Sequence, residues 1–372
     1  MNTFGKIFRM TTYGKSHGPE IGVIINGCPS GLKISLNEIQ YELDRRKPGE
    51  SLVTSQRREE DRVEILDGII DGKTTGGFIK LRILNKDVDL SDYNKLKYKP
   101  RPGSADFTWY EKYGDWYAFD RTGGRETASR VMAGAIAKKL LRKYDIDVLG
   151  YSIEIAGIKS RKSYYEDFNL TKLEEYRKII ESNPVRCIDK HAAKEMENAI
   201  IKAKEEGDSV GGVVEAIAIG VPVGLGEPNY NKLSAALYFG FGSIPAVTGI
   251  HIGLFDRVRM HGSESNDEFY IENGKVKTRT NWCGGILGGI SDGMPIVATM
   301  GIKPTSSIAK KQRTIDLQKM KEVTIEIKGR HDPCIVPRAV PVVEAMMALT
   351  LADHMLLAHY IPRSLFQKLM GT

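Results

Sequence analysis

The chain has 372 residues, 41% hydrophobic and 27% charged, with a net charge of +7 and a pI near 9.0. This length excludes a minimal domain and allows a large buried core, and the composition is that of an ordinary globular protein. The positive charge favours anionic partners, either nucleic acid or phosphorylated and carboxylated metabolites, without choosing between them.

The cysteines and the apolar runs limit the cellular compartments in which the protein can be expected. The four cysteines stand far apart with no CxxC pair, which signals neither a zinc site nor a disulfide framework and favours a reduced compartment. Residues 1–12 lack the apolar core of a signal peptide. The closest approach to a membrane span, 345–361, is interrupted by Asp353, His354 and His359. We therefore predict a soluble, cytoplasmic protein with no membrane partner.

In the first third of the chain, apolar runs bounded by turn residues predict strands at 22–27, 63–70 and 77–84. Ser35 and Glu38 have the spacing of a capping box, which predicts a helix that runs to about Arg46. Residues 87–114 are rich in Tyr, Lys, Pro and Gly, and we expect an irregular functional loop there.

Further along, a strong helix is expected from 126 to 144, and the small residues at 133–137 allow close packing on that helix. Later strands are expected at 148–158, 210–221, 248–254 and 294–302. Later helices are expected at 170–181, 192–206, 232–242 and 338–359. The lysine-rich segment 159–206 is interpreted as peripheral. Since several strands follow one another without crossover helices, we expect one mixed domain, 1–372, with antiparallel sheets.

Residues 328–334 concentrate side chains suited to chemistry directly after a strand-like run. Arg330 offers a planar fork for phosphate or carboxylate, and His331 and Asp332 can move protons. A charged turn that closes a hairpin is the competing interpretation of this segment.

His17 lies between small residues, so a ligand can reach it, and imidazole is well suited to donate a proton near neutral pH. A purely structural histidine is the alternative. The neighbouring sequence 14–16, Gly-Lys-Ser, is not a phosphate loop, because Arg9 stands where that motif requires glycine.

Basic residues recur in loops and at helix starts, several beside Gly or Pro, where backbone N–H groups can bind anions. They are Arg45, Arg46, Lys47, Arg57, Arg58, Arg101, Arg121, Arg125, Arg130, Lys303, Arg330 and Arg338. Such a set suits one small, highly anionic ligand better than a duplex, whose binders favour a continuous basic stripe, so we expect no nucleic acid.

Two further segments have the composition of ligand sites. The glycine-rich stretch 284–293 would let a flat ring lie against the backbone. Lys303, with hydroxyls at 305–307, is suited to hold a phosphate. A tight turn and a capped helix start are the alternatives.

Together these motifs resemble the chorismate synthase family over nearly the whole chain. The resemblance is carried by 8–18, 43–49, 101–103, 125–127, 284–293, 303–307 and 328–339. It implies an α+β fold, a β-α-β sandwich with helices between antiparallel sheets, assembled as a homotetramer.

The resemblance also implies a carbon–oxygen lyase acting on phosphate in the shikimate pathway of aromatic amino-acid biosynthesis. Its reaction is the trans 1,4-elimination of phosphate from 5-enolpyruvylshikimate 3-phosphate, which gives chorismate. Reduced FMN (FMNH2) is required although there is no net redox change, and NADPH is a candidate reductant. The phosphates and carboxylates of these ligands would use the surplus of arginine.

The resemblance assigns roles residue by residue. His17 is the proton donor to the departing phosphate, and Asp332 lies near flavin N5 and helps remove the proton lost from the substrate ring. The substrate-binding residues are Arg45, Arg46, Arg101, Arg125 and Arg330. The flavin-binding residues are Arg121, Thr122, Gly123, Ala246, Gly288, Lys303, Pro304, Thr305, Ser306, Ser307 and Arg330.

This chain departs from the family's usual pattern at Lys15, Leu52, Ser104 and Gly123. Ser104 replaces a histidine, and losing an acid–base group typically costs about 10²–10⁴ in rate. The departures leave open a diverged paralogue that binds flavin or a phosphorylated metabolite without this activity. A nucleic-acid-binding protein is a third interpretation, which rests on net charge alone.

Overall fold

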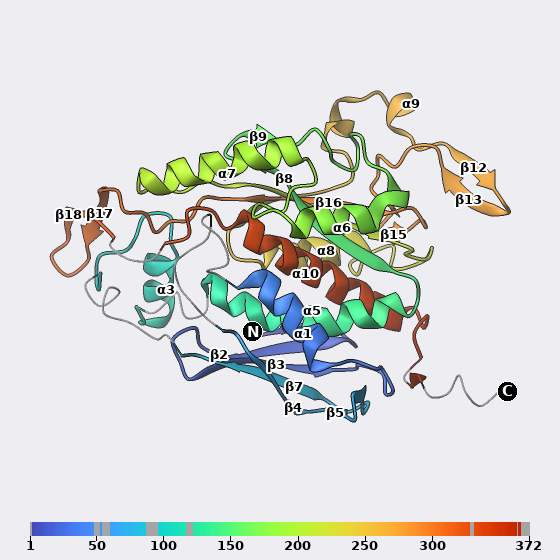
Figure 1. Ribbon diagram of the computed structural model, residues 1–372, viewed down its shortest axis with the longest axis horizontal. Helices are drawn as coiled ribbons and strands as arrows, with labels where there is room; N and C mark the ends of the chain where they lie inside the picture. Colours follow the sequence, from blue (N-terminus) through green and yellow to red (C-terminus); the bar gives the residue numbers. More distant parts are fainter. Residues whose placement is uncertain are drawn as a thin grey trace.

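The computed structural model describes residues 2–47, 53, 60–86, 96–116, 122–327, 331–362 and 364–365. Over this part of the chain, two five-stranded antiparallel sheets enclose a layer of helices (Figure 1). The first sheet has the order β1 (Thr3–Phe4), β2 (Arg9–Gly14), β3 (Glu20–Asn26), β7 (Ile79–Leu84), β4 (Val63–Asp67). The second has the order β11 (Val247–Ile252), β16 (Ile296–Ile302), β10 (Gly212–Ile219), β8 (Asp147–Ile155), β9 (Ile158–Lys159).

The enclosed layer contains α1 (Leu36–Arg46), α5 (Thr127–Arg142), α8 (Leu233–Gly242) and α10 (Val336–Leu357). In α1, the side chain of Ser35 accepts from the amide of Glu38, whose carboxylate accepts from the amide of Ser35, so the predicted capping box is confirmed. Helices α5 and α10 touch at Gly134, where an added Cβ would lie 2.3 Å from the Cβ of Ala345. The small residues predicted to allow close packing therefore do so.

Helix α10 forms the centre of the sandwich. It is long and apolar enough to cross a membrane by composition alone, but 94% of its most apolar window is buried inside the protein. Near its end, the carboxylate of Asp353 accepts hydrogen bonds from the backbone amides of Lys6, Ile7 and Phe8 at 2.6–2.9 Å. The last helix of the sandwich is thus fastened to the loop between its first two strands.

Two more helices, α6 (Leu173–Glu181) and α7 (Lys190–Glu205), cover the outer face of the second sheet (Figure 1). Beneath this cover, Glu215 of β10 accepts hydrogen bonds from the Tyr151 hydroxyl (2.5 Å) and the Tyr164 amide (2.7 Å). Burial raises the pKa of Glu215 to about 7.

Short elements complete the described chain. They are the hairpins β5 (Ile69–Ile70)–β6 (Lys73–Thr74), β12 (Phe269–Glu272)–β13 (Lys275–Thr278), β14 (Ile286–Leu287)–β15 (Ile290–Ser291) and β17 (Gln312–Asp316)–β18 (Lys321–Ile325), the helices α3 (Asp106–Tyr113) and α9 (Gly262–Ser265), and the 3-10 turns η1 (Gly124–Glu126), η2 (Leu170–Lys172) and η3 (Phe255–Arg259).

The predicted α+β sandwich is confirmed, and the differences are local. The loop expected over 87–114 contains helix α3, which Gly114 ends with a φ of +66°. The strand expected over 148–158 folds back at Ala156 and Gly157, which both have positive φ, into β8 and β9. Residues 303–308 form a loop that leads to β17, so the helix start weighed there is not found. The four cysteines are buried thiols.

Candidate active site

A cavity of about 500 Å³ lies where the end of α1 meets the beginnings of α5 and α10. The first turns of α5 and α10 both contribute lining residues, so the positive ends of the two helix dipoles lie beside the cavity. The residues that line the cavity are Ser16, His17, Arg46, Arg101, Gly103, Ser104, Ala105, Thr122, Gly123, Gly124, Arg125, Thr127, Ile244, Pro245, Ala246, Lys303, Pro304, Thr305, Ser306, Ser307, His331, Asp332, Ile335, Arg338, Ala339 and Val342. The cavity therefore combines cations with hydroxyls, imidazoles and a carboxylate.

His17 reaches the cavity from the tight turn between β2 and β3. Asn85 fastens this turn, because its side-chain amide donates to the carbonyl oxygens of Lys15 (2.9 Å) and Gly18 (2.6 Å). The carbonyl oxygen of the same side chain accepts from Nε of Arg125 at 2.6 Å. One asparagine thus sets the relative positions of an imidazole and a guanidinium.

Arg46 and Arg125 share the buried carboxylate of Asp61. Its Oδ2 lies 2.5 Å from Nη2 of Arg46 and its Oδ1 lies 2.6 Å from Nη1 of Arg125. Although burial opposes ionisation, the two guanidiniums hold the pKa of Asp61 below its usual value. Burial, with Arg338 and Arg125 nearby, lowers the pKa of Arg46 to about 10, which still leaves it charged at neutral pH. The cluster holds two cations against one anion, so an added anion is favoured there.

Arg101 and Lys303 lie on two loops that dock against each other. Asp106 holds Arg101 through Nε (2.8 Å) and Nη2 (2.7 Å), and Nη1 of Arg101 donates to the hydroxyl of Ser307 at 2.9 Å. On the facing loop, Lys303 Nζ donates to the carbonyl oxygen of Gly103. Ser104 lines the cavity beside them, and its hydroxyl accepts from the Asp106 amide at 3.2 Å.

Asp332 pairs with the guanidinium of Arg338, and its backbone carbonyl accepts from the hydroxyl of Thr305 at 2.8 Å. Ala246 also lines the cavity, and its φ of +68° is unusual for a residue with a side chain. The carbonyl oxygen of Ala246 accepts from the amide of Lys303 at 3.0 Å.

Most of the predicted site residues that the structure describes meet at this cavity. They are His17, Arg46, Arg101, Thr122, Gly123, Arg125, Ala246, Lys303, Pro304, Thr305, Ser306, Ser307 and Asp332. Arg121, Arg330, Leu52, Arg57 and Arg58 lie outside the described residues.

Two predicted site residues are not among the described residues that line the cavity. Arg45 was expected to assist substrate binding, but its guanidinium is buried among the carboxylates of Glu42, Glu181 and Glu344. Gly288, expected at the flavin, lies in the turn between β14 and β15, where an added Cβ would meet nothing within 4 Å.

The structure also adds residues that the sequence-based assignment omitted. Asp61 and Asn85 organise the cavity from behind, and Arg338 pairs with Asp332. Asp61 and Asn85 carry no local signal, because each acts on partners far along the chain. Arg338 is one of the basic residues that the sequence places in loops and at helix starts. Its proximity in sequence to residues 328–334 could have identified it as a site residue.

Comparison with known proteins places the chain in a family. The family model described as chorismate synthase matches residues 8–356. Chorismate synthases of Methanocaldococcus jannaschii and Archaeoglobus fulgidus are each 51% identical, over 97% and 98% of this chain and 98% and 100% of theirs. A crystal structure of chorismate synthase has a TM-score of 0.77 and 31% identity, covering 95% of this chain and 93% of that one.

The fold and the cavity define an α+β protein with a cationic site suited to an anionic ligand, and the family match and the relatives identify it as a carbon–oxygen lyase. The chain belongs to the chorismate synthase family. Its function is the family's elimination of phosphate from 5-enolpyruvylshikimate 3-phosphate to give chorismate. Neither the diverged paralogue nor the nucleic-acid-binding protein is favoured.

Proposed function

We propose that the cavity binds 5-enolpyruvylshikimate 3-phosphate together with reduced FMN and that its residues carry out the trans 1,4-elimination. The observation that carries this proposal is the gathering of Arg46, Arg101, Arg125 and Lys303 with the imidazoles of His17 and His331 and the carboxylate of Asp332 around one cavity. A volume of about 500 Å³ is within the usual range for small-molecule sites.

The substrate anions are bound by Arg46, Arg101 and Arg125, with Arg330 as a further candidate. Guanidinium groups pair with phosphate and carboxylate through two parallel hydrogen bonds. Nε of Arg46 is buried without a hydrogen-bond partner among the described residues, which supports a polar ligand at this wall. The starts of α5 and α10 add positive character on the same side.

The residues at 303–307 fit the phosphate of FMN. Lys303 supplies a cation, and Thr305, Ser306 and Ser307 supply hydroxyls from one loop. Ala246, Thr122 and Gly123, together with Arg121, would contact the rest of the cofactor. Gly288 does not lie on the cavity, so any contact it makes with the flavin would come from outside the described lining.

His17 donates a proton to the departing phosphate, and the carboxylate of Asp332 helps remove the proton lost from the substrate ring. When bound, reduced FMN supplies a flavin N5 able to take that proton, with no net redox change. The ion pair with Arg338 orients the carboxylate of Asp332, and Asn85 holds the His17 turn at a set distance from Arg125.

We further propose a cytoplasmic homotetramer whose flavin is reduced with NADPH. Large apolar side chains remain exposed on α8, η3 and the β12–β13 hairpin, and exposed apolar surface favours association. They are Tyr238, Phe239, Phe255, Val258, Phe269, Ile271 and Val276.

The test is an anaerobic assay of chorismate and phosphate release with chemically reduced FMN. Replacing His17→Ala should lower turnover by about 10²–10⁴-fold while FMN still binds, because only a proton donor is lost. The matched control is His191→Ala, an exposed histidine on α7, which should leave turnover unchanged. Unchanged turnover in His17→Ala would remove His17 from the mechanism, and flavin binding without product in the unmodified protein would favour the paralogue.

A further inference from the structure

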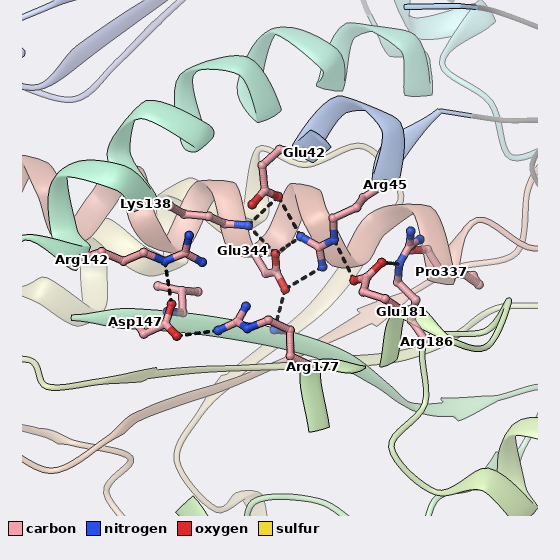
Figure 2. Close-up of polar contacts among 12 residues, drawn as sticks. Glu42, Arg45, Lys138, Arg142, Asp147, Arg177, Glu181, Arg186, Pro337 and Glu344 are labelled. Carbon is pink, nitrogen blue, oxygen red and sulfur yellow. Dashed lines mark hydrogen bonds and ion pairs between the residues drawn. The ribbon is translucent and has the colours of Figure 1, made fainter. Parts of the chain in front are cut away.

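A buried ion network lies beside the cavity (Figure 2). One of its members, Arg45, directly precedes the cavity residue Arg46 in the sequence. Its members are Glu42 and Arg45 of α1, Lys138 of α5, Glu181 of α6 and Glu344 of α10. The side chain of Glu344 has no exposed surface, and those of Lys138 and Arg45 are 5% and 7% exposed. The network thus joins the middle helix layer to the outer one at a point shielded from water.

Arg45 is the hub of the buried ion network. Its Nη1 lies 2.6 Å from Glu344 and 2.8 Å from Glu42, its Nη2 lies 3.1 Å from Glu344, and its Nε lies 2.7 Å from Glu181. All three guanidinium nitrogens therefore donate to carboxylates. Such an arrangement leaves little capacity for a substrate anion.

The remaining capacity of the carboxylates is also used. Glu344 accepts from Nζ of Lys138 at 2.5 Å and from the amide of Gly150 on β8 at 2.9 Å. Burial opposes ionisation of Glu344, but Arg45 and Lys138 hold its pKa well below the usual value. The network is therefore charged, and directional hydrogen bonds set its geometry.

The network adjoins the active-site arginines in two places. Arg46 follows Arg45 in the last turn of α1, where successive side chains point about 100° apart, so one enters the network and the other the cavity. The carbonyl oxygen of Arg46 accepts from Nε of Arg338 at 3.1 Å. The last turn of α1 therefore lies between the buried ion network and the cavity.

The second connection passes through Arg186. Its Nε lies 3.6 Å from Glu181, and its Nη1 donates at 2.7 Å to the carbonyl oxygen of Pro337, in the first turn of α10 (Figure 2). Arg338 is the next residue. Both Arg46 and Arg338 are thus neighbours of residues that this set of contacts holds in place.

Stability alone does not account for such a network, since well-packed apolar side chains of similar volume often stabilise a core as well or better. We propose that Arg45 is a positioning residue, held by the buried carboxylates of Glu42, Glu181 and Glu344 so that the last turn of α1 presents Arg46, and with it Arg338, to the cavity. The inference rests on the proposed role of Arg46 in substrate binding.

The test is a double-mutant cycle on kcat/KM for the elimination with reduced FMN. Arg45→Lys keeps the charge but cannot reach the three carboxylates together, and it should lower kcat/KM by about 10²-fold, the effect of displacing a binding group by about 1 Å. If Arg45 acts through Arg46, the double variant with Arg46→Lys will be no slower than Arg46→Lys alone. Turnover by the unmodified protein separately tests the proposed function.

Two results would overturn the proposal. Losses that multiply in the double variant would show that Arg45 acts independently of Arg46, for example by touching substrate. A lower melting temperature with kcat/KM unchanged would show that the network only stabilises the fold.

A milder variant keeps the test decisive if Arg45→Lys does not fold. Glu181→Gln changes a side chain that is 24% exposed and leaves Glu42 and Glu344 on Arg45. It should lower kcat/KM by about 10-fold in a protein that keeps Arg46, and it should cause no further loss in the Arg46→Lys variant. Glu174→Gln, on the same helix but 79% exposed, is the matched control and should change nothing. A Glu181→Gln protein as active as this control would overturn the proposal.

Discussion

The carboxylate of Asp61 offers the sharpest test of how the cavity is held together. Its side chain is fully buried between Arg46 and Arg125, and its φ of +44° is a conformation that asparagine tolerates. Replacing Asp61→Asn therefore removes the charge with little change in shape or backbone. Two guanidiniums are then left facing each other without their shared anion.

Breaking a buried ion pair by removing one partner costs about 3–5 kcal/mol. For 372 residues, the entropy of unfolding is roughly 0.8 kcal/mol per kelvin. The melting temperature of Asp61→Asn should therefore fall by about 4–6 °C. Since the pKa of Asp61 is lowered in the folded state, its contribution is present above the usual value of 3.8 and is lost as the pH falls further.

The measurement is differential scanning calorimetry of the ligand-free protein across this pH range. Asp44→Asn is the control, because Asp44 is also a carboxylate paired with a cation but its side chain is 42% exposed. The reasoning predicts a large difference between the two variants near pH 7 that shrinks in acid. Equal, small losses in both variants would refute it.

Two further predictions concern stability. Glu215→Gln should be more stable than the unmodified protein by about 3 kcal/mol at pH 8 but by only about 1 kcal/mol at pH 5. The reason is that a carboxyl with a raised pKa stabilises the fold below about 4.5 and loses that contribution as the pH rises to about 7. A difference in calorimetry that is independent of pH would contradict this. Gly134→Ala should lower the free energy of unfolding by about 1–3 kcal/mol, because the new methyl would lie 2.3 Å from Ala345. Gly262→Ala is the control and should not lower it, because a Cβ added there meets no atom within 4 Å. Equal melting temperatures of the two variants would contradict the close contact of α5 and α10.

Sequence patterns predicted individual helices and strands where the relevant interactions are local, whereas the sandwich was implied by the resemblance to the family. The capping box at Ser35 located the start of α1, and the small residues around Gly134 indicated where two helices would touch. Helix α3 escaped prediction because its residues show no clear apolar periodicity; its aromatic Tyr110 instead stacks on Trp116, with ring centroids 4.1 Å apart.

The site was predictable only in part, for a geometric reason. Adjacent arginines look equivalent in a sequence, but the turn of α1 sends Arg46 to the cavity and Arg45 to the buried ion network. Asp61 gains its role only when the fold brings it to Arg46 and Arg125, which are 15 and 64 residues away along the chain. No local pattern records such pairings.

The central place of α10 has a consequence for synthesis of the protein. Both sheets and the other enclosed helices precede residues 336–357, yet α10 is the element that packs against α1, α5, α8, β8 and β10 together. A growing chain on the ribosome therefore carries the inner face of the second sheet before the helix that covers it exists. Exposed apolar faces of this kind invite aggregation, so nascent chains released before residue 336 should be substrates for chaperones.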